Sequence, residues 1–222
     1  KSGDLMIRGG DFYAVWLEEA GRWSTDEFDV INMVDAELDA EAAKLIGNVE
    51  STVTVAHMWD SSYPSIDNWH GYCQRKMRDN YTPLDEKLVF EDTPINKADY
   101  SSKRLDYPLK PGPCPSYERL MSTLYDEKER HKLEWAIGSI VVGDSKTIQK
   151  FIVMYGPAGT GKSTVLNIIE QLFQGYFTTF DAKSLGSNNN SFALESFKSN
   201  PLVAIQHDGD LSRIEDNTKL NS

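Results

Sequence analysis

The sequence predicts an α/β protein with a parallel-sheet domain in residues 113–222, preceded by a smaller α+β, mainly helical domain in residues 1–112. Three observations lead to this prediction. Short apolar runs typical of buried parallel strands occur in the second half. A strand-turn pattern and an amphipathic helix pattern occur in the first half. A proline-rich stretch lies between them, and 222 residues suffice for two domains of ordinary size.

The first domain is predicted to open with a hairpin and a long helix. Residues 11–16 form a short aromatic and apolar run that predicts a strand, and residues 19–22 contain a glycine and predict the turn. Ser24 with Glu27 three residues later fits a capping box, so we expect the helix to begin there. Apolar residues then recur every three or four positions until Gly47, over about six turns. These positions are Phe28, Ile31, Val34, Leu38, Ala42 and Leu45.

The acidity of the chain is concentrated at its start. The net charge is -11, and residues 1–50 hold twelve acidic and four basic side chains, which leaves only -3 for the rest. Because nucleic acids are bound mainly through Lys and Arg, the total charge argues at first sight against such a partner. The local distribution removes that argument for the second half. The acidic helix residues fall between the apolar positions and indicate a solvated face rather than a metal site.

Residues 69–81 interleave aromatic and basic side chains, which is the chemistry of a stacking surface for single-stranded DNA. We favour the simpler alternative, in which the aromatic residues are core and the basic residues their solvated flank. His70 and Cys73 have the spacing of zinc ligands, but a zinc site needs about four, so we do not predict one. Cys73 and Cys114 are the only cysteines, and we expect both to be reduced.

The domain boundary is predicted in a stretch rich in proline. Four prolines lie between Asp92 and Pro115, and such a stretch sustains neither a helix nor a central strand. Ser116 is predicted to cap a helix that runs to Leu124. Apolar residues between 133 and 141 predict a second helix, which we expect to end at Gly143.

The strongest motif of the chain begins after the apolar run 151–155, which predicts a buried parallel strand. The next nine residues match the phosphate-binding P-loop pattern GxxxxGK[ST] in full. They are Gly156, Pro157, Ala158, Gly159, Thr160, Gly161, Lys162, Ser163 and Thr164. Apolar residues from 165 to 172 predict a buried helix after them. A strand, this loop and a helix are the context that the motif requires, so we expect the chain to bind a nucleoside triphosphate.

The residue types of the loop indicate the chemistry. Glycines let backbone N–H groups turn toward phosphates, and the positive end of the helix dipole faces them. Lys162 is expected to contact the β- and γ-phosphates and thereby to act in catalysis, while the Ser163 hydroxyl is expected to bind Mg²⁺.

A P-loop also needs an acidic residue at the end of a neighbouring strand, where it holds water on the metal ion. Residues 202–205 predict such a strand, and Asp208 follows it as the candidate metal-site and catalytic carboxylate. Asp210 is the alternative to Asp208 as the metal-site carboxylate. In the simplest interpretation neither binds metal, and both are ordinary loop aspartates. Residues 176–180 predict a further strand, and residues 192–198 predict a short helix.

Three segments of the second half resemble a known family. The runs 135–138 (WAIG), 156–164 and 204–210 (AIQHDGD) are similar to those of the phage and plasmid primase-helicases of the poxvirus type. These proteins carry a superfamily 3 helicase of the AAA+ class. Residues 21–23, the acidic helix and residues 88–90 more loosely resemble the linker domain that precedes the helicase.

The resemblance implies an AAA+ ATPase that uses ATP and Mg²⁺ to translocate on single-stranded or forked DNA as a homo-oligomeric ring, often a hexamer, during replication. The family usually has Asp-Glu or a lone Glu where this chain has His207-Asp208, which leaves the water-activating carboxylate open. The chain starts at Lys1 and stops at Ser222 before a sensor strand or an arginine finger, so we expect a fragment with an incomplete helicase domain.

Two other functions also use a P-loop. A P-loop regulatory or assembly module would bind ATP without unwinding DNA, and a small-molecule kinase would need an acceptor pocket and a lid that no motif marks. The sequence has no apolar run of about 18 residues and no signal peptide, so we expect a cytoplasmic protein without a membrane partner.

Overall fold

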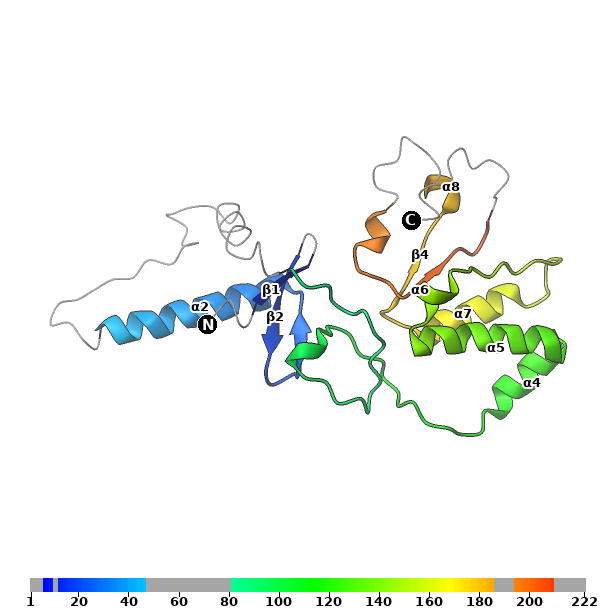
Figure 1. Ribbon diagram of the computed structural model, residues 1–222, viewed down its shortest axis with the longest axis horizontal. Coiled ribbons are helices and arrows are strands. Elements are labelled where there is room, and N and C mark those ends of the chain that lie inside the picture. The colour runs from blue at the N-terminus through cyan, green and yellow to red at the C-terminus, as the bar shows by residue number, and fades with distance from the viewer. Residues whose placement is uncertain (1–5, 10–11, 47–80, 186–193, 210–222) are drawn as a thin grey trace. The chain divides into compact units, whose positions relative to one another are not determined.

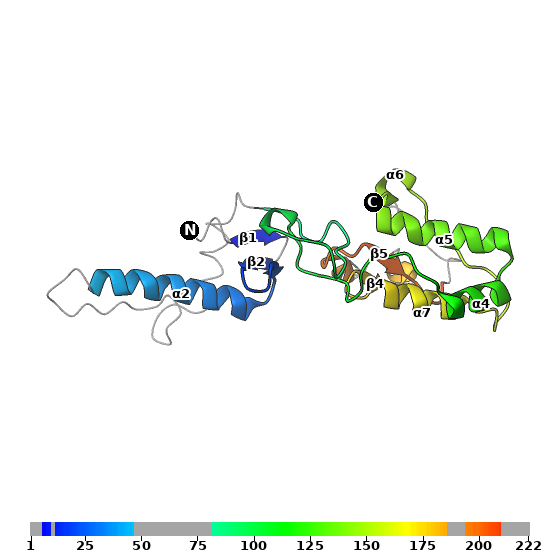
Figure 2. The ribbon, with the colours of Figure 1, turned by 90° about the horizontal axis from the view of Figure 1, so that it is seen from below.

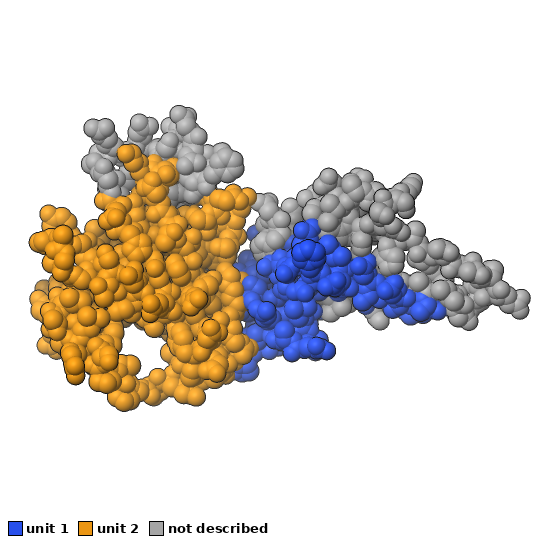
Figure 3. All heavy atoms as spheres, turned by 180° about the vertical axis from the view of Figure 1, so that it is seen from behind, with its two compact units in different colours: residues 1–84, 94–102 blue, residues 85–93, 103–222 orange. Residues whose placement is uncertain are grey.

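The computed structural model describes residues 6–9, 12–46, 81–185 and 194–209 (Figure 1). The chain divides into two compact units, which Figure 3 shows in different colours. Unit 1 comprises Lys1–Leu84 and Pro94–Ser102, and unit 2 comprises Asp85–Thr93 and Lys103–Ser222. Residues 85–93 and 103–112, which the sequence places with the first domain, therefore pack with the second unit.

Unit 1 contains a three-stranded antiparallel sheet in the order β1-β2-β3. Its strands are β1 (Met6–Gly9), β2 (Phe12–Leu17) and β3 (Arg22–Ser24), and the register places Trp16 opposite Trp23. The strand and turn predicted between residues 11 and 22 are confirmed. Strand β1 was not predicted, because a four-residue segment with two apolar side chains gives little periodic signal.

The long helix α2 (Glu27–Ile46) follows the sheet, close to the predicted range. Its first turn is capped by Asp26, whose Oδ1 accepts a hydrogen bond from the Phe28 backbone N–H at 2.9 Å. The predicted cap at Ser24 is wrong, because Ser24 belongs to β3 and its hydroxyl donates to the Asp29 carboxylate at 2.6 Å. Phe28 was predicted on the apolar face but is exposed, and Val30 instead packs against Val15. None of the helices in the described ranges combines the length and the apolar character needed to cross a bilayer.

Trp23 is the centre of the second cluster of unit 1. It is almost fully buried with Ala14 and Leu84, and its ring stacks on Tyr100 with centroids 5.8 Å apart. The indole Nε1–H donates to the carbonyl of Lys97 at 2.9 Å, at the start of the 3₁₀ helix η1 (Lys97–Asp99). The Trp23 side chain therefore connects the hairpin to the segment 94–102 inside one unit.

Unit 2 contains three helices that were predicted, α4 (Pro115–Leu124), α5 (Glu127–Val142) and α7 (Lys162–Leu172). Two further short helices in the described residues, α6 (Ser145–Ile148) and α8 (Ala182–Leu185), were not predicted. Helix α4 begins at Pro115, so the predicted cap at Ser116 lies one residue inside the helix; proline is favoured at this first position because its missing N–H has no partner there anyway. Gly143 ends α5 in the left-handed conformation, as predicted.

The strands β4 (Phe177–Thr179) and β5 (Val203–Ile205) form a parallel pair in unit 2 (Figure 2). Both fall inside predicted strands, and the 3₁₀ helix η2 (Glu195–Phe197) lies inside the predicted short helix. Residues 151–155 are not a strand in this structure. A strand needs a neighbour for its N–H and C=O groups, and β4 and β5 pair with each other rather than with this segment. Phe151 is 83% and Tyr155 99% exposed.

The core of unit 2 includes residues that precede the predicted domain boundary at residue 112. Phe90 and Leu105 are buried in one cluster with Phe173, Tyr176 and the β5 residues Val203 and Ile205. Residues 89–91 and 105–107 also join each other through two backbone hydrogen bonds, Leu105 N to Val89 O at 2.8 Å and Glu91 N to Tyr107 O at 3.1 Å. The segments 85–93 and 103–107 are therefore part of the body that carries the P-loop.

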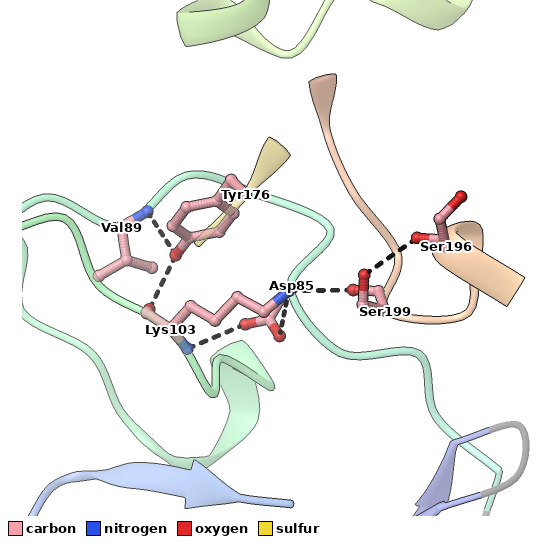
Figure 4. A network of polar contacts seen from close by, with 6 residues as sticks. All are labelled: Asp85, Val89, Lys103, Tyr176, Ser196 and Ser199. Carbon is pink, nitrogen blue, oxygen red and sulfur yellow. Dashed lines mark hydrogen bonds and ion pairs between the residues drawn. The ribbon is translucent and has the colours of Figure 1, made fainter. Parts of the chain in front are cut away.

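A network of polar contacts fixes these segments (Figure 4). The fully buried Tyr176 accepts a hydrogen bond from the Val89 N–H at 3.3 Å and donates to the Lys103 carbonyl at 2.8 Å. The Lys103 ammonium group donates to the Ser199 carbonyl at 3.0 Å, on the segment that leads into β5. Buried Asp85 accepts from the Lys103 backbone N–H at 3.1 Å.

Candidate nucleotide-binding site

The P-loop residues 156–161 lead directly into helix α7, which starts at Lys162. Gly159 and Gly161 both have φ of +79°, in the left-handed region that a side chain disfavours. Gly161 is the residue that precedes the helix, so its backbone sets the direction in which α7 begins. The two glycines thus give the loop the tight turn that the sequence motif predicts.

The side chain of Lys162 folds back over the loop. Its ammonium group donates to the carbonyl oxygens of Gly156 at 2.8 Å and Pro157 at 2.6 Å, and reaches the Thr160 hydroxyl at 3.3 Å. The Thr160 hydroxyl itself donates to the Pro157 carbonyl at 2.9 Å. The ammonium group therefore lies on the loop, where neutral oxygen atoms hold it. An anion is a stronger hydrogen-bond partner for an ammonium group and can replace these atoms.

The first turn of α7 supplies further donors. In any α-helix the first N–H groups have no acceptor within the helix, and here the first helical bond runs from Val165 N to Gly161 O at 3.1 Å. The N–H groups of Lys162, Ser163 and Thr164 precede that bond, and the side chains of Ser163 and Thr164 are exposed. Backbone donors, the helix dipole and an ammonium group thus occur within a few residues, which suits a phosphate chain.

The loop rests on the junction of helices α4 and α5. A Cβ atom at Gly161 would come within 2.6 and 2.7 Å of the two terminal carbons of Leu124. Tyr125 packs beside Leu124 in the cluster of Met121, Leu133 and Val165, the last of which is on α7. Its hydroxyl is buried without a hydrogen-bond partner within the described residues, and burial raises the pKa of Tyr125. Sequence reasoning missed the role of Leu124 because a contact over this separation leaves no local pattern.

Asp208 follows β5, as predicted, and its side chain is exposed. The structure joins Lys162 to Gly156, Pro157 and Thr160, but within the described residues it shows no hydrogen bond between Asp208 and Ser163 or Lys162. The alternative carboxylate, Asp210, lies outside the described residues. The predicted metal-site residues Ser163 and Asp208 therefore lie at the predicted ends of their elements, without a hydrogen bond between them in the described residues.

Two side chains next to Asp208 hold its turn in place, and sequence reasoning missed both roles. His207 Nε2 lies 2.7 Å from Glu170 Oε1 on α7. The Gln206 amide accepts from the Ala182 N–H at 3.3 Å and donates to the Asp208 carbonyl at 3.2 Å. These contacts join residues 24 to 37 positions apart or form inside the turn itself, so no periodic pattern could reveal them.

The residues present fit a nucleotide and Mg²⁺ by their chemistry. Mg²⁺ prefers oxygen ligands and is often held by one or two protein groups together with phosphates and water. The Ser163 hydroxyl and the Asp208 carboxylate are donors of this kind. In the described ranges no three His, Cys, Asp or Glu side chains gather as a metal cluster. The zinc alternative at His70 and Cys73 lies outside those ranges. So do all residues of the stacking alternative at 69–81 except Tyr81, whose side chain is exposed.

Comparison with protein-family models, with curated proteins and with solved structures finds no match to this chain in any of the three.

Proposed function

We propose that this chain binds ATP through residues 156–164 and belongs to an ATP-driven DNA helicase. The observation that carries the proposal is the Lys162 ammonium group, folded over a loop with two left-handed glycines at the first residue of α7. Few arrangements other than a phosphate site call for a lysine, turned backbone and a helix N-terminus at one point.

In this proposal, ATP binding changes the hydrogen-bond acceptors of the Lys162 ammonium group. The ammonium group leaves the carbonyl oxygens of Gly156 and Pro157 and pairs with the β- and γ-phosphates. The N–H groups of the first turn of α7 donate to phosphate oxygens, since the helix leaves them without acceptors. Ser163 supplies a hydroxyl ligand to Mg²⁺, which neutralises charge on the phosphates, and Asp208 orients water at the metal.

The DNA-helicase part of the proposal rests on the resemblance of residues 107–222 to the AAA+ superfamily 3 domain of phage-type primase-helicases. The parallel pair of β4 and β5, with Asp208 just after β5, supports it. The complete protein would form a homo-oligomeric ring, a hexamer in the usual case, that hydrolyses ATP while it moves along single-stranded or forked DNA in the cytoplasm of a host cell. Unit 1 would then be the linker before the helicase.

A second candidate is a P-loop regulatory or assembly ATPase without unwinding activity. The observation that favours it is His207 beside Asp208, where the helicases usually carry Asp-Glu or a lone Glu. In that function, ATP binding locks an oligomer while hydrolysis stays slow, because the Asp208 turn lacks the Glu that usually activates water in the helicases.

The test is ATP hydrolysis with and without single-stranded DNA, in the full protein and in Lys162→Ala. We expect DNA to stimulate hydrolysis, and Lys162→Ala to lower turnover by about a hundredfold or more, as for loss of one charge-stabilising donor. Lys183→Ala, which removes an exposed lysine on α8, is the matched control and should leave turnover unchanged. Hydrolysis indifferent to DNA would favour the regulatory module, and a protein that binds no nucleotide would exclude both functions.

A further inference from the structure

The turn that carries Asp208 is tied to two other parts of unit 2. His207 joins it to helix α7 through Glu170 at 2.7 Å. Gln206 joins it to the start of α8 through the Ala182 N–H at 3.3 Å, and its amide nitrogen holds the Asp208 carbonyl at 3.2 Å. The Asp208 carboxylate stays exposed between these two attachments.

The attachment through Glu170 has a geometric consequence. Glu170 lies eight residues after Lys162 on the same helix, which corresponds to about 12 Å along the axis. Because a helix is rigid over this length, the contact fixes the distance between the P-loop lysine and the Asp208 turn. The side chains of His207 and Glu170 are only 35% and 22% exposed, so water competes with the contact less than with a surface pair.

Resting on the proposed function, we infer that His207 and Glu170 are positioning residues that set the place of the Asp208 carboxylate relative to the P-loop. They touch neither phosphate nor metal in this role. Groups that orient a metal-binding carboxylate commonly change metal affinity or activity by about 10- to 100-fold when removed. Nucleotide binding therefore depends on Lys162 and the loop, whereas metal binding and turnover depend also on the contact between His207 and Glu170.

The experiment measures three quantities in the full protein: the Kd for ATP without Mg²⁺, kcat at saturating ATP, and the Mg²⁺ concentration at half-maximal rate. The variants are His207→Leu and Glu170→Leu, which remove the contact, and His207→Gln and Glu170→Gln, which can keep a hydrogen bond. Glu195→Gln is the matched control, because it breaks the exposed ion pair with Lys198 on the η2 segment.

We expect the leucine variants to lower kcat by about tenfold or more and to raise the Mg²⁺ requirement, with the Kd for ATP within about twofold of the unsubstituted protein. The glutamine variants should recover most of the rate, and the double leucine variant should be no slower than either single one, because both remove the same contact. Glu195→Gln should change nothing.

Unchanged kcat and Mg²⁺ dependence in the leucine variants would overturn the positioning role while leaving the proposed function standing. A parallel loss of ATP binding and turnover that the glutamine variants do not recover would also overturn it, because that is the result of a general loss of structure. If neither the unsubstituted protein nor Lys162→Ala binds a nucleotide, the proposed function is overturned, and the positioning role with it.

Discussion

The hydroxyl group of Tyr176 donates a hydrogen bond to the carbonyl oxygen of Lys103 at 2.8 Å and thereby joins chain segments 73 positions apart. The same oxygen atom accepts from the Val89 N–H at 3.3 Å. One phenol thus satisfies a backbone acceptor and a backbone donor beside the core of unit 2, at the point where β4 begins.

Tyr176→Phe should destabilise unit 2 by about 1–3 kcal/mol, because the substitution leaves partners of a buried hydroxyl without a hydrogen bond. Urea unfolding followed by circular dichroism measures the change, with the midpoint lowered and the slope unchanged. Tyr155→Phe is the control, since the Tyr155 side chain is exposed and its hydroxyl remains in water. Equal midpoints for both variants would contradict this assignment.

Leu105→Ala should destabilise the protein by about 2–5 kcal/mol, the usual cost of truncating a buried leucine. Leu105 is buried with Phe90 and Phe173, although it lies inside the proline-rich stretch and before the predicted domain boundary at residue 112. Leu109→Ala, four residues later and largely exposed, should change the free energy of unfolding by less than about 0.5 kcal/mol. If the two variants unfold alike, residues 103–107 do not belong to the core of unit 2.

Gly161→Ala should weaken ATP binding by about tenfold or more in a titration with a fluorescent nucleotide. A side chain at φ of +79° costs about 1–2 kcal/mol, and its Cβ would also meet Leu124. Leu124→Ala should restore part of the affinity in the double variant by removing that contact. Gly138→Ala, inside α5 with open space around the added Cβ, should keep full affinity and slightly raise stability.

Trp23→Phe should destabilise unit 1 by about 1–3 kcal/mol, because the Lys97 carbonyl loses its indole donor in a partly buried hydrogen bond and the stack with Tyr100 shrinks. Trp16→Phe is the matched control. The Trp16 indole donates to the exposed Glu18 carboxylate at 2.7 Å, where water can replace it. Thermal unfolding of both variants, followed by circular dichroism, gives the comparison, and a larger loss for Trp16 would contradict the assigned roles.

The Ser184 hydroxyl donates to Asp181 at 2.8 Å and, with the Lys183 N–H, holds the pKa of the Asp181 carboxyl below its usual value. A folded-state pKa below the unfolded value adds stability that is present above the unfolded pKa and is lost as the pH falls through the folded pKa. Ser184→Ala should raise the Asp181 pKa, which carbon-13 NMR of the carboxyl group can follow. Ser122→Ala, which removes only a bond to the Glu118 carbonyl, should leave it unchanged.

In the part of the chain that the structure describes, local patterns in the sequence predicted most helices and three of the five strands. The period of α2, the proline at the start of α4 and the glycine that ends α5 are all local signals. The P-loop was predicted for the same reason, since its function requires fixed residue types at fixed spacing. The start of α2 was misplaced by two residues because Ser24 and Asp26 are both good caps, and only the pairing of Ser24 in β3 decides between them.

Features that depend on distant partners could not be predicted in this way. Residues 151–155 have the composition of a buried strand, but whether they form one depends on neighbouring strands. The contact of His207 with Glu170 and the packing of Leu105 under β5 arise from the path of the chain in space. The proline-rich stretch led to a predicted boundary at residue 112, whereas the chain passes between the two compact units at residues 84/85, 93/94 and 102/103. Asp85 and Lys103, which both belong to the second unit, are joined there by a hydrogen bond.

The exposed side chains of residues 151–155 also affect how the protein behaves in solution. Phe151 and Tyr155 offer apolar surface directly before the P-loop, while a net charge of -11 keeps separate molecules apart. Salt shortens the range of that repulsion from about 10 Å at 0.1 M to about 3 Å at 1 M without weakening apolar attraction. Light scattering should therefore increase with ionic strength, and ATP kinetics are best measured at low salt, where copies of the chain do not cover one another's loops.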